Sequence, residues 1–332
     1  MINDKISLFL DNITELKNVK GTMCSDIFVK CAALTLTMKN KKADAEQINH
    51  CRNILKNNTS LFSNFRGNNI LISSVYLSLE DNPEEAIHNV INIYEKLKKE
   101  FFTSEYLVLA SWIIYNSNST KPLDIVIKNT REAYDIMKSN HYFLTSSEDY
   151  TAATMIAISH DNLNNTFVEI ENCFNILKDN GLRSKNDIQA LSNILSLGAG
   201  TVEEKTSKVL TLNNLLKNTK FPLKHYSLPL LAIPTFITND YSSFVAEYSN
   251  TAQLLKEQKG FGAFSLRSDL RNMIAAALVC SEYLDELSNP YDNTIVETAN
   301  NTALTITLAI QMATTAAIAG ASSAAVASSS SN

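Results

Sequence analysis

The sequence contains little glycine or proline, with 8 Gly and 6 Pro among 332 residues. Helices tolerate these residues poorly, whereas turn-rich β folds need them. The scarcity therefore predicts an all-α protein. A chain of this length usually forms one large or two medium domains, unless it is a repeat array in which each unit packs only on its neighbours.

The sequence also lacks the motifs of common cofactor and catalytic sites. It has no P-loop, no dinucleotide-binding glycine pattern, no His-Glu-x-x-His, no paired Cys-x-x-Cys and no Gly-x-Ser-x-Gly. The five histidines are scattered, and none follows another at the i+3 or i+4 spacing of helical metal ligands. We therefore expect no cofactor and no metal, and no enzyme class is favoured.

The charged residues and cysteines exclude further classes. A net charge of −5, without any block of Lys and Arg, argues against a nucleic-acid-binding protein. The five cysteines are an odd number without metal-site spacing, which favours buried thiols in a reducing cytoplasm. The N-terminal apolar run is too short for a signal peptide. We expect a cytoplasmic protein without a nucleic-acid partner.

One short phrase recurs at nearly constant intervals. A large apolar residue followed by Lys occurs at Leu16, Leu55, Leu97, Met137, Leu177, Leu216 and Leu255. Subtracting neighbouring positions gives intervals of 39, 42, 40, 40, 39 and 39 residues. Such regularity over seven units is typical of a repeat architecture.

Each unit divides into a first helix, a polar corner and a more apolar second helix. In the third unit one apolar stripe runs along the first helix and consists of Ile87, Val90, Ile91, Tyr94 and Leu97. The more apolar second helices are expected in the inner layer. In the sixth unit Pro229 and Pro234 predict a kinked or broken second helix. We predict an array of about seven antiparallel helix pairs over residues 1–290, a solenoid that is open or curved towards a toroid.

The end of the chain differs in composition. No charge follows Glu297, and residues 301–327 are rich in Ala, Thr and Ile. We expect residues 291–327 to form a helix that caps the array and residues 328–332 to be a disordered Ser-rich tail. The uncharged run is also long enough to anchor the protein in a membrane, although polar residues dilute it.

The corners carry most of the polar residues. Thr145 with Glu148, Ser146 with Asp149, and Ser184 with Asp187 fit the pattern of helix-capping boxes, which is a better explanation than catalysis. The guanidinium groups of the corner arginines are suited to binding carboxylate or phosphate.

Three corner segments resemble a known family. They are Phe62-Ser-Asn-Phe-Arg-Gly67, the run from Met137 to Tyr150, and Lys259-Gly-Phe-Gly-Ala-Phe-Ser265 with Arg271 after it. They are similar to the bacterial domain of unknown function four thousand and three, from low-GC Gram-positive bacteria. The resemblance implies a bacterial cytoplasmic protein and no activity. It makes the second, fourth and seventh corners candidates for a shared site, with Arg66, His141, Thr145, Ser146, Asp149, Tyr150, Arg267 and Arg271 as binding residues.

Three functions remain open. The first is a binding or scaffold protein that engages a protein or peptide through the second helices and the corners, with Arg66, Arg267 and Arg271 holding acidic groups. The second requires a closed toroid, in which corner carboxylates hydrolyse a sugar-like substrate. The candidate catalytic carboxylates are those of Glu105, Glu148, Asp149, Asp187 and Asp269. The third is a tail-anchored membrane protein that uses residues 301–327. The oligomeric state is left open.

Overall fold

The protein is all-helical in the part that the structure describes. The computed structural model describes residues 2–19, 26–117 and 119–287. These residues form fourteen α-helices and two short 3₁₀ helices, without a β-strand. The prediction of an all-α protein is confirmed.

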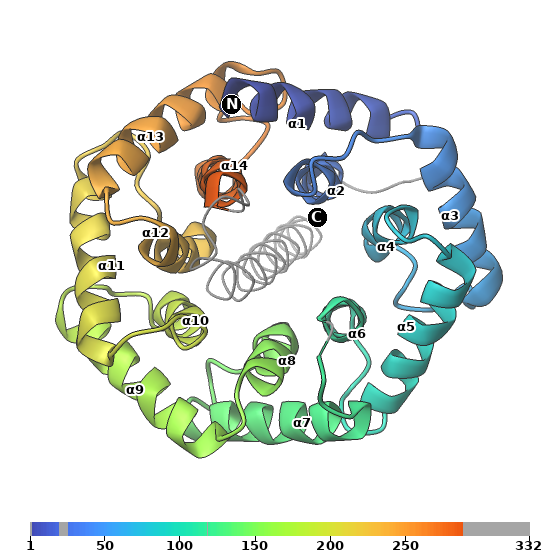
Figure 1. Cartoon of the computed structure of the whole chain (residues 1–332), viewed down its shortest axis with the longest axis horizontal. Coiled ribbons are helices and arrows are strands. Elements are labelled where there is room, and N and C mark those ends of the chain that lie inside the picture. The colour runs from blue at the N-terminus through green and yellow to red at the C-terminus, as the bar shows by residue number, and fades with distance from the viewer. Residues whose placement is uncertain (1, 20–25, 118, 288–332) are drawn as a thin grey trace, which may run out of the picture.

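The helices alternate between an outer and an inner layer (Figure 1). The outer helices are α1 (Ile2–Leu16), α3 (Ala45–Asn58), α5 (Pro83–Leu97), α7 (Leu123–Asn140), α9 (Leu163–Asp179), α11 (Val202–Lys217) and α13 (Tyr241–Glu257). The inner helices are α2 (Asp26–Met38), α4 (Asn69–Ser78), α6 (Glu105–Asn116), α8 (Tyr150–Ser159), α10 (Lys185–Leu195), α12 (Ala232–Ile237) and α14 (Ser268–Leu287). The 3₁₀ helices η1 (Ser147–Asp149) and η2 (His225–Leu231) precede α8 and α12. The chain is thus an array of seven helix pairs, as its period predicts.

The array closes into a ring. Figure 1 shows the first outer helix, α1, beside the last pair, α13 and α14. Lys5 of α1 bonds to Ser281 and Asp285 of α14. The ring of Phe9 meets that of Phe261 edge-on, with centroids 6.0 Å apart. A closed ring leaves neither end of the array exposed, which removes the need for a capping repeat at this seam.

The repeated apolar residue supplies the core of each unit. All seven positions, from Leu16 to Leu255, lie in the last turn of an outer helix and are at most 2% exposed. Four residues of the stripe are buried along one face of α5, namely Ile87, Val90, Tyr94 and Leu97, and Ile91 packs partly buried against the same core. An interval of about 40 residues therefore separates equivalent buried positions in successive outer helices.

The inner helices are buried on nearly all sides. Every residue of α8 from Tyr150 to Ile158 is buried. In α6 the indole of Trp112 is fully buried and donates a 3.1 Å hydrogen bond to Ser73 of α4. The sixth inner element is broken as expected, since η2 holds Pro229 and gives way to α12 at Ala232.

Several expectations concern residues outside the described part. They are the capping helix at residues 291–327, the tail at residues 328–332 and the membrane anchor at residues 301–327. Within the described residues, no helix has both the length and the apolar character to cross a bilayer. The buried thiols expected from the sequence are found at Cys31, Cys51, Cys173 and Cys280.

Candidate functional site

The corners that join outer to inner helices lie at one face of the ring. Every inner helix begins at such a corner, and all seven inner helices stand side by side around the centre (Figure 1). We call this surface the corner face. It comprises the described residues 17–19, 59–68, 98–104, 141–146, 180–184, 218–224 and 258–267.

Hydrogen bonds join neighbouring units along the corner face. The amide of Asn69 donates to the carbonyl oxygens of Asn64 and Glu105, each at 3.0 Å. Gln189 donates to the Thr145 hydroxyl at 3.2 Å. Asn272 donates to the Pro222 carbonyl at 3.1 Å. These bonds join the second unit to the third, the fourth to the fifth and the sixth to the seventh at the corner face.

Arg66, in the second corner, is committed to its own unit. Its guanidinium donates to the carbonyl oxygens of Lys56 and Thr59, at 2.6 and 2.7 Å, and to the Thr59 hydroxyl at 3.0 Å. Burial lowers the pKa of this guanidinium. The side chain satisfies carbonyls at the end of α3, which have no partner within the helix.

In the fourth corner, His141 and Thr145 hold the end of α7 against neighbouring units. His141 Nε2 lies 2.9 Å from a Glu171 carboxylate oxygen, and its ring packs on Phe174 with centroids 4.5 Å apart. The Thr145 hydroxyl donates to the Met137 carbonyl at 3.1 Å. Thr145 is therefore not the helix cap that its spacing to Glu148 suggests.

Ser146, Asp149 and Tyr150 shape the start of α8. Ser146 and Asp149 form the expected capping box, in which the Asp149 carboxylate accepts from the Ser146 amide at 2.8 Å. Burial raises the pKa of Asp149 from 3.8 to about 7. Tyr150 is buried against the rings of Phe101 and Tyr134. The fourth corner thus brings five candidate residues together, each with a partner in the structure.

A second acidic group lies beside this corner. The Tyr106 hydroxyl, in the first turn of α6, donates a hydrogen bond to the Glu148 carboxylate. Burial raises the pKa of Glu148. Both oxygens of the Glu105 carboxylate lie 3.5 Å from the amide nitrogen of Asn68. Tyr106 therefore bonds to Glu148, whose pKa is raised, and follows Glu105 directly in the chain.

Arg267 and Arg271 share a cavity between the sixth and seventh corners, which we call the rim pocket. Its volume is about 570 Å³. It is lined by Lys220, Pro222, Lys224, His225, Arg267, Ser268, Asp269, Arg271 and Asn272. Four of these side chains are cations and one is a carboxylate. The excess of positive charge is unusual in a protein whose net charge is −5.

Arg271 is the most deeply placed of these cations. It is 5% exposed, and its Nη1 donates to the Phe261 carbonyl at 3.1 Å. Its Nε is buried without a hydrogen-bond partner among the described residues, and so is Oδ1 of the neighbouring Asn272. Burial lowers the pKa of the Arg271 guanidinium. A buried charge with an unused donor is a costly arrangement unless a ligand satisfies it.

The other wall of the rim pocket holds a strained residue. His225 has a φ of +50°, a left-handed conformation that is uncommon for residues other than glycine. Its Nδ1 lies 3.9 Å from the Asp187 carboxylate. Arg267 bonds to Asp269 at 2.7 Å and stacks over Tyr226, 5.2 Å from the ring centre. Strain of this kind gathers at ligand sites.

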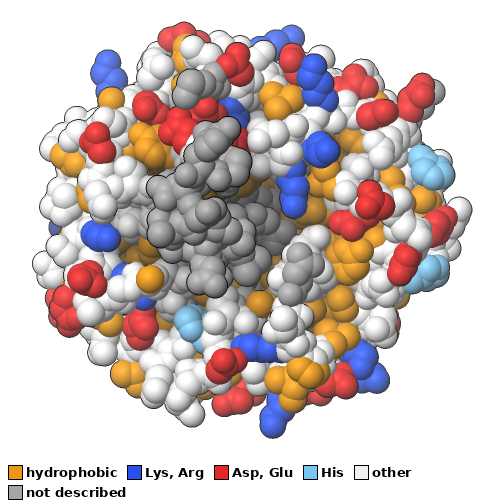
Figure 2. Space-filling view, in the orientation of Figure 1, with side chains coloured by type: hydrophobic (Ala, Val, Ile, Leu, Met, Phe, Trp, Pro, Cys, Tyr) orange, Lys and Arg blue, Asp and Glu red, His pale blue; other side chains and the backbone are white. Residues whose placement is uncertain are grey.

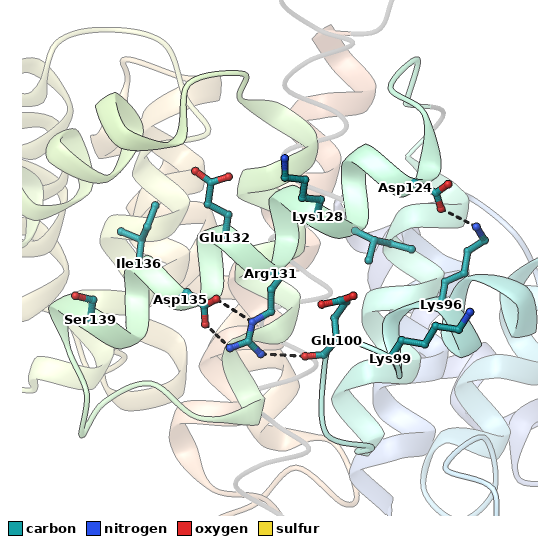
Figure 3. A pocket seen from close by; sticks show the side chains of 11 residues that line it. Lys96, Lys99, Glu100, Asp124, Lys128, Arg131, Glu132, Asp135, Ile136 and Ser139 are labelled. Carbon is teal, nitrogen blue, oxygen red and sulfur yellow. Dashed lines mark hydrogen bonds and ion pairs between the residues drawn. The ribbon is translucent and has the colours of Figure 1, made fainter.

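A larger cavity lies outside the ring, between α5 and α7 (Figure 3). Its volume is about 650 Å³. Its charges are largely matched, because Lys96 bonds to Asp124 at 2.6 Å and Arg131 pairs with Asp135 and donates to the Glu100 carbonyl. Charges that neutralise one another leave little for a charged ligand, so the rim pocket is the better candidate.

The sequence indicated only part of the rim pocket. Arg267 and Arg271 were candidates, whereas Lys220, Lys224 and Asn272 were not. One sequence feature could have indicated the rest of the pocket. The sixth corner contains three basic residues, Lys220, Lys224 and His225, which precede Arg267 by about one repeat length. Among the described residues, no three His, Cys, Asp or Glu side chains gather as metal ligands do.

The comparisons with known proteins agree with the resemblance of the corner segments. The uncharacterised protein YeaA of Bacillus subtilis (strain 168) is 22% identical over 322 residues, which cover 94% of this chain and 93% of that protein. No solved structure matches the chain. The family described as "Protein of unknown function (DUF4003)" matches residues 12–313. The chain therefore belongs to this family of proteins of unknown function.

Proposed function

We propose that the protein is a bacterial cytoplasmic binding protein that holds an acidic group of a protein or peptide partner in the rim pocket. The observation that carries the proposal is the position of Arg271, which is 5% exposed with a buried Nε that lacks a partner. Lys220, Lys224 and Arg267 line the same cavity. A carboxylate or phosphate there would compensate the charge that the fold has buried.

The chemistry of the cations supports an oxygen anion as the ligand. A guanidinium presents its donors as a planar fork that matches carboxylate and phosphate. Lysines at the mouth attract such a group from solution and raise the rate of encounter. Asp269 pairs with Arg267 at 2.7 Å and offsets its charge, which leaves the positive charges of Lys220, Lys224 and Arg271 in the pocket.

A labelled acidic peptide tests the proposal. The fluorescence anisotropy of a fluorescein-labelled hexaglutamate peptide is measured against the protein, with phosphate as a competitor. Hydrogen bonds to charged groups contribute about 1.5–3 kcal/mol each, so Lys224→Ala and Arg267→Ala should each weaken binding about tenfold or more. Lys128→Ala, in the cavity outside the ring, is the matched control and should bind as the wild type does. No binding by the wild type, or an equal loss in the control, refutes the proposal.

A hydrolase is the second candidate, because the array closes and carboxyl groups with raised pKa values lie at the corner face. Glu148 would donate a proton to a leaving group, since partial desolvation raises its pKa and Tyr106 hydrogen-bonds to it. Glu105, the residue before Tyr106, would act as the base or nucleophile. Release of reducing ends from oligosaccharides measures this activity, and Glu148→Gln should abolish it. A wild type that hydrolyses none of them removes this candidate.

A further inference from the structure

The corner face exposes apolar side chains that the fold does not use. Nine large apolar side chains are substantially exposed among the described residues, and three of these, Ile125, Val168 and Leu215, lie on outer helices. The other six lie on the corner face. They are Leu61, Phe62, Phe102, Tyr142, Phe143 and Phe264. All five exposed aromatic rings are thus on one surface, which marks an interaction site.

Neighbouring residues show that this exposure is not a general property of the corners. In the third corner Phe101 is 6% exposed and packs against Tyr134 and Tyr150. Phe102, the next residue, is 89% exposed. The second corner repeats the contrast, with Phe65 buried against Tyr94 while Phe62 is 99% exposed. In each of these two corners, one phenylalanine ring packs in the core and the other is exposed to solvent.

The same face is strongly basic. Its described loops contain nine cations and one carboxylate, Glu100. The cations are Lys17, Arg66, Lys98, Lys99, Arg183, Lys220, Lys224, Lys259 and Arg267. The loops that return from inner to outer helices hold four cations, Lys39, Lys41, Lys42 and Lys121, against five carboxylates, Asp44, Glu80, Asp81, Asp161 and Asp240. That second face is turned to the viewer in Figure 2, where acidic and basic side chains stand intermixed.

We propose that the corner face docks on the surface of an anionic phospholipid bilayer. Exposed phenylalanine and tyrosine rings enter the boundary between headgroups and acyl chains, while the lysines of the corner loops face the lipid phosphates. A combination of apolar tips and cations is what binds proteins to such interfaces. Each Lys or Arg near an anionic leaflet contributes about 1 kcal/mol, so a face with this excess is attracted before any ring inserts.

The charge pattern also disfavours the other occupants. A second copy of the chain, docked face to face, would bring two surfaces together that each carry an excess of cations in their loops. A nucleic acid would match the charge, but it leaves fully exposed apolar tips such as Phe62 and Leu61 in water. A bilayer surface with anionic headgroups accommodates both the exposed apolar side chains and the excess of positive charge.

Vesicle co-sedimentation of the full chain tests the proposal. The vesicles are phosphatidylcholine alone, or phosphatidylcholine mixed with phosphatidylglycerol. The corner variant combines Phe62→Ser, Phe102→Ser and Phe264→Ser. The control variant combines Ile125→Ser, Val168→Ser and Leu215→Ser, which removes exposed apolar groups from the outer helices. Thermal unfolding establishes that both variants fold as the wild type does.

The wild type should bind vesicles with phosphatidylglycerol, and added salt should weaken the binding. Even partial burial of a phenylalanine ring contributes on the order of 1 kcal/mol, so the corner variant should bind about tenfold or more weakly. The control variant should bind like the wild type. Failure to bind anionic vesicles, or an equal loss in the control, overturns the proposal. Self-association or nucleic-acid binding that the corner variant abolishes, without vesicle binding, also overturns it.

This inference does not rest on the proposed function, although Lys220, Lys224 and Arg267 belong both to the rim pocket and to the corner face. The corner variant changes no residue of the rim pocket, and the hexaglutamate assay contains no lipid. Loss of vesicle binding with intact peptide binding separates the two sites. If the wild type binds vesicles but no acidic peptide, the membrane inference stands alone.

Discussion

Lys5 donates a 2.8 Å hydrogen bond to the hydroxyl of Ser281, a residue 276 positions further along the chain. Its ammonium also lies 2.6 Å from the Asp285 carboxylate and 3.9 Å from that of Glu282. The Lys5 side chain is 3% exposed. A cation on the first helix is therefore buried against the last described helix, which joins the two ends of the array.

Removing this cation should weaken the seam of the ring. Lys5→Ala leaves a buried hydroxyl and a partly buried carboxylate without their partner, at a cost on the order of 1–3 kcal/mol. Lys96→Ala is the control, because the Lys96–Asp124 pair is exposed and such pairs contribute less than about 1 kcal/mol. Urea unfolding measures both changes. Equal effects of the two substitutions would show that Lys5 does not close the ring.

The repeated apolar residue and the exposed ring of one corner should differ sharply in their effect on stability. Leu97→Ala removes a fully buried side chain and should cost about 2–5 kcal/mol. Phe102→Ala, five residues later, should change the free energy of unfolding by about 0.5 kcal/mol or less. Chemical denaturation of both variants provides the comparison. A large loss of unfolding free energy for Phe102→Ala would mean that the Phe102 ring is packed in the core.

The period of the sequence predicts the helix pairs well because one physical requirement sets it. Leu97 must be buried, and each unit needs the same length of chain to bury its counterpart. Closure is different, since it depends on the small rotation between successive units. Nothing local to Lys5 indicates that Asp285 will lie beside it. The residues around each corner thus define the repeat units but not the curvature of the array.

Asp149 should make stability depend on pH. Its pKa is raised from 3.8 to about 7 by burial, so the folded protein retains a proton that the unfolded chain releases. Stability from this group is present below pH 4 and is lost as the pH rises towards 7. Asp149→Asn keeps an acceptor for the Ser146 amide but cannot ionise.

The melting temperature of this variant relative to the wild type should therefore rise between pH 4 and pH 8. Glu46→Gln, an exposed change in the first turn of α3, should show no such trend and serves as the control. A constant difference for Asp149→Asn, or one that falls with pH, would contradict the burial of its carboxyl group.

Gly198 should tolerate no side chain. A Cβ at this position would lie 2.2 Å from the ring of Phe236 in α12, a separation that atoms do not adopt. Overpacking of this kind costs about 1–3 kcal/mol, so Gly198→Ala should lower the melting temperature. Gly262→Ala meets no atom within 4 Å and should be neutral. An unchanged melting temperature for Gly198→Ala would mean that the Phe236 ring does not lie against Gly198.

The candidate site could be predicted only in part, because the type of a residue does not determine where its side chain points. Arg66 and Arg271 both suit an anion, yet Arg66 uses its donors on the carbonyls that end α3. Phe101 and Phe102 are chemically identical, and only their order relative to the start of α6 decides which is buried. The lysines of the corners appear scattered along the chain, and the closed ring places them on one face.

Small-angle X-ray scattering of the full chain tests the closed ring most directly. A compact chain of this length has a radius of gyration of about 20 Å. An open array of seven pairs, stacked at about 8–10 Å, would instead extend over roughly 60–70 Å and give a longer, asymmetric distance distribution. We predict the compact value with a single symmetric maximum. A clearly larger radius with an extended tail would contradict the ring, and with it the shared corner face.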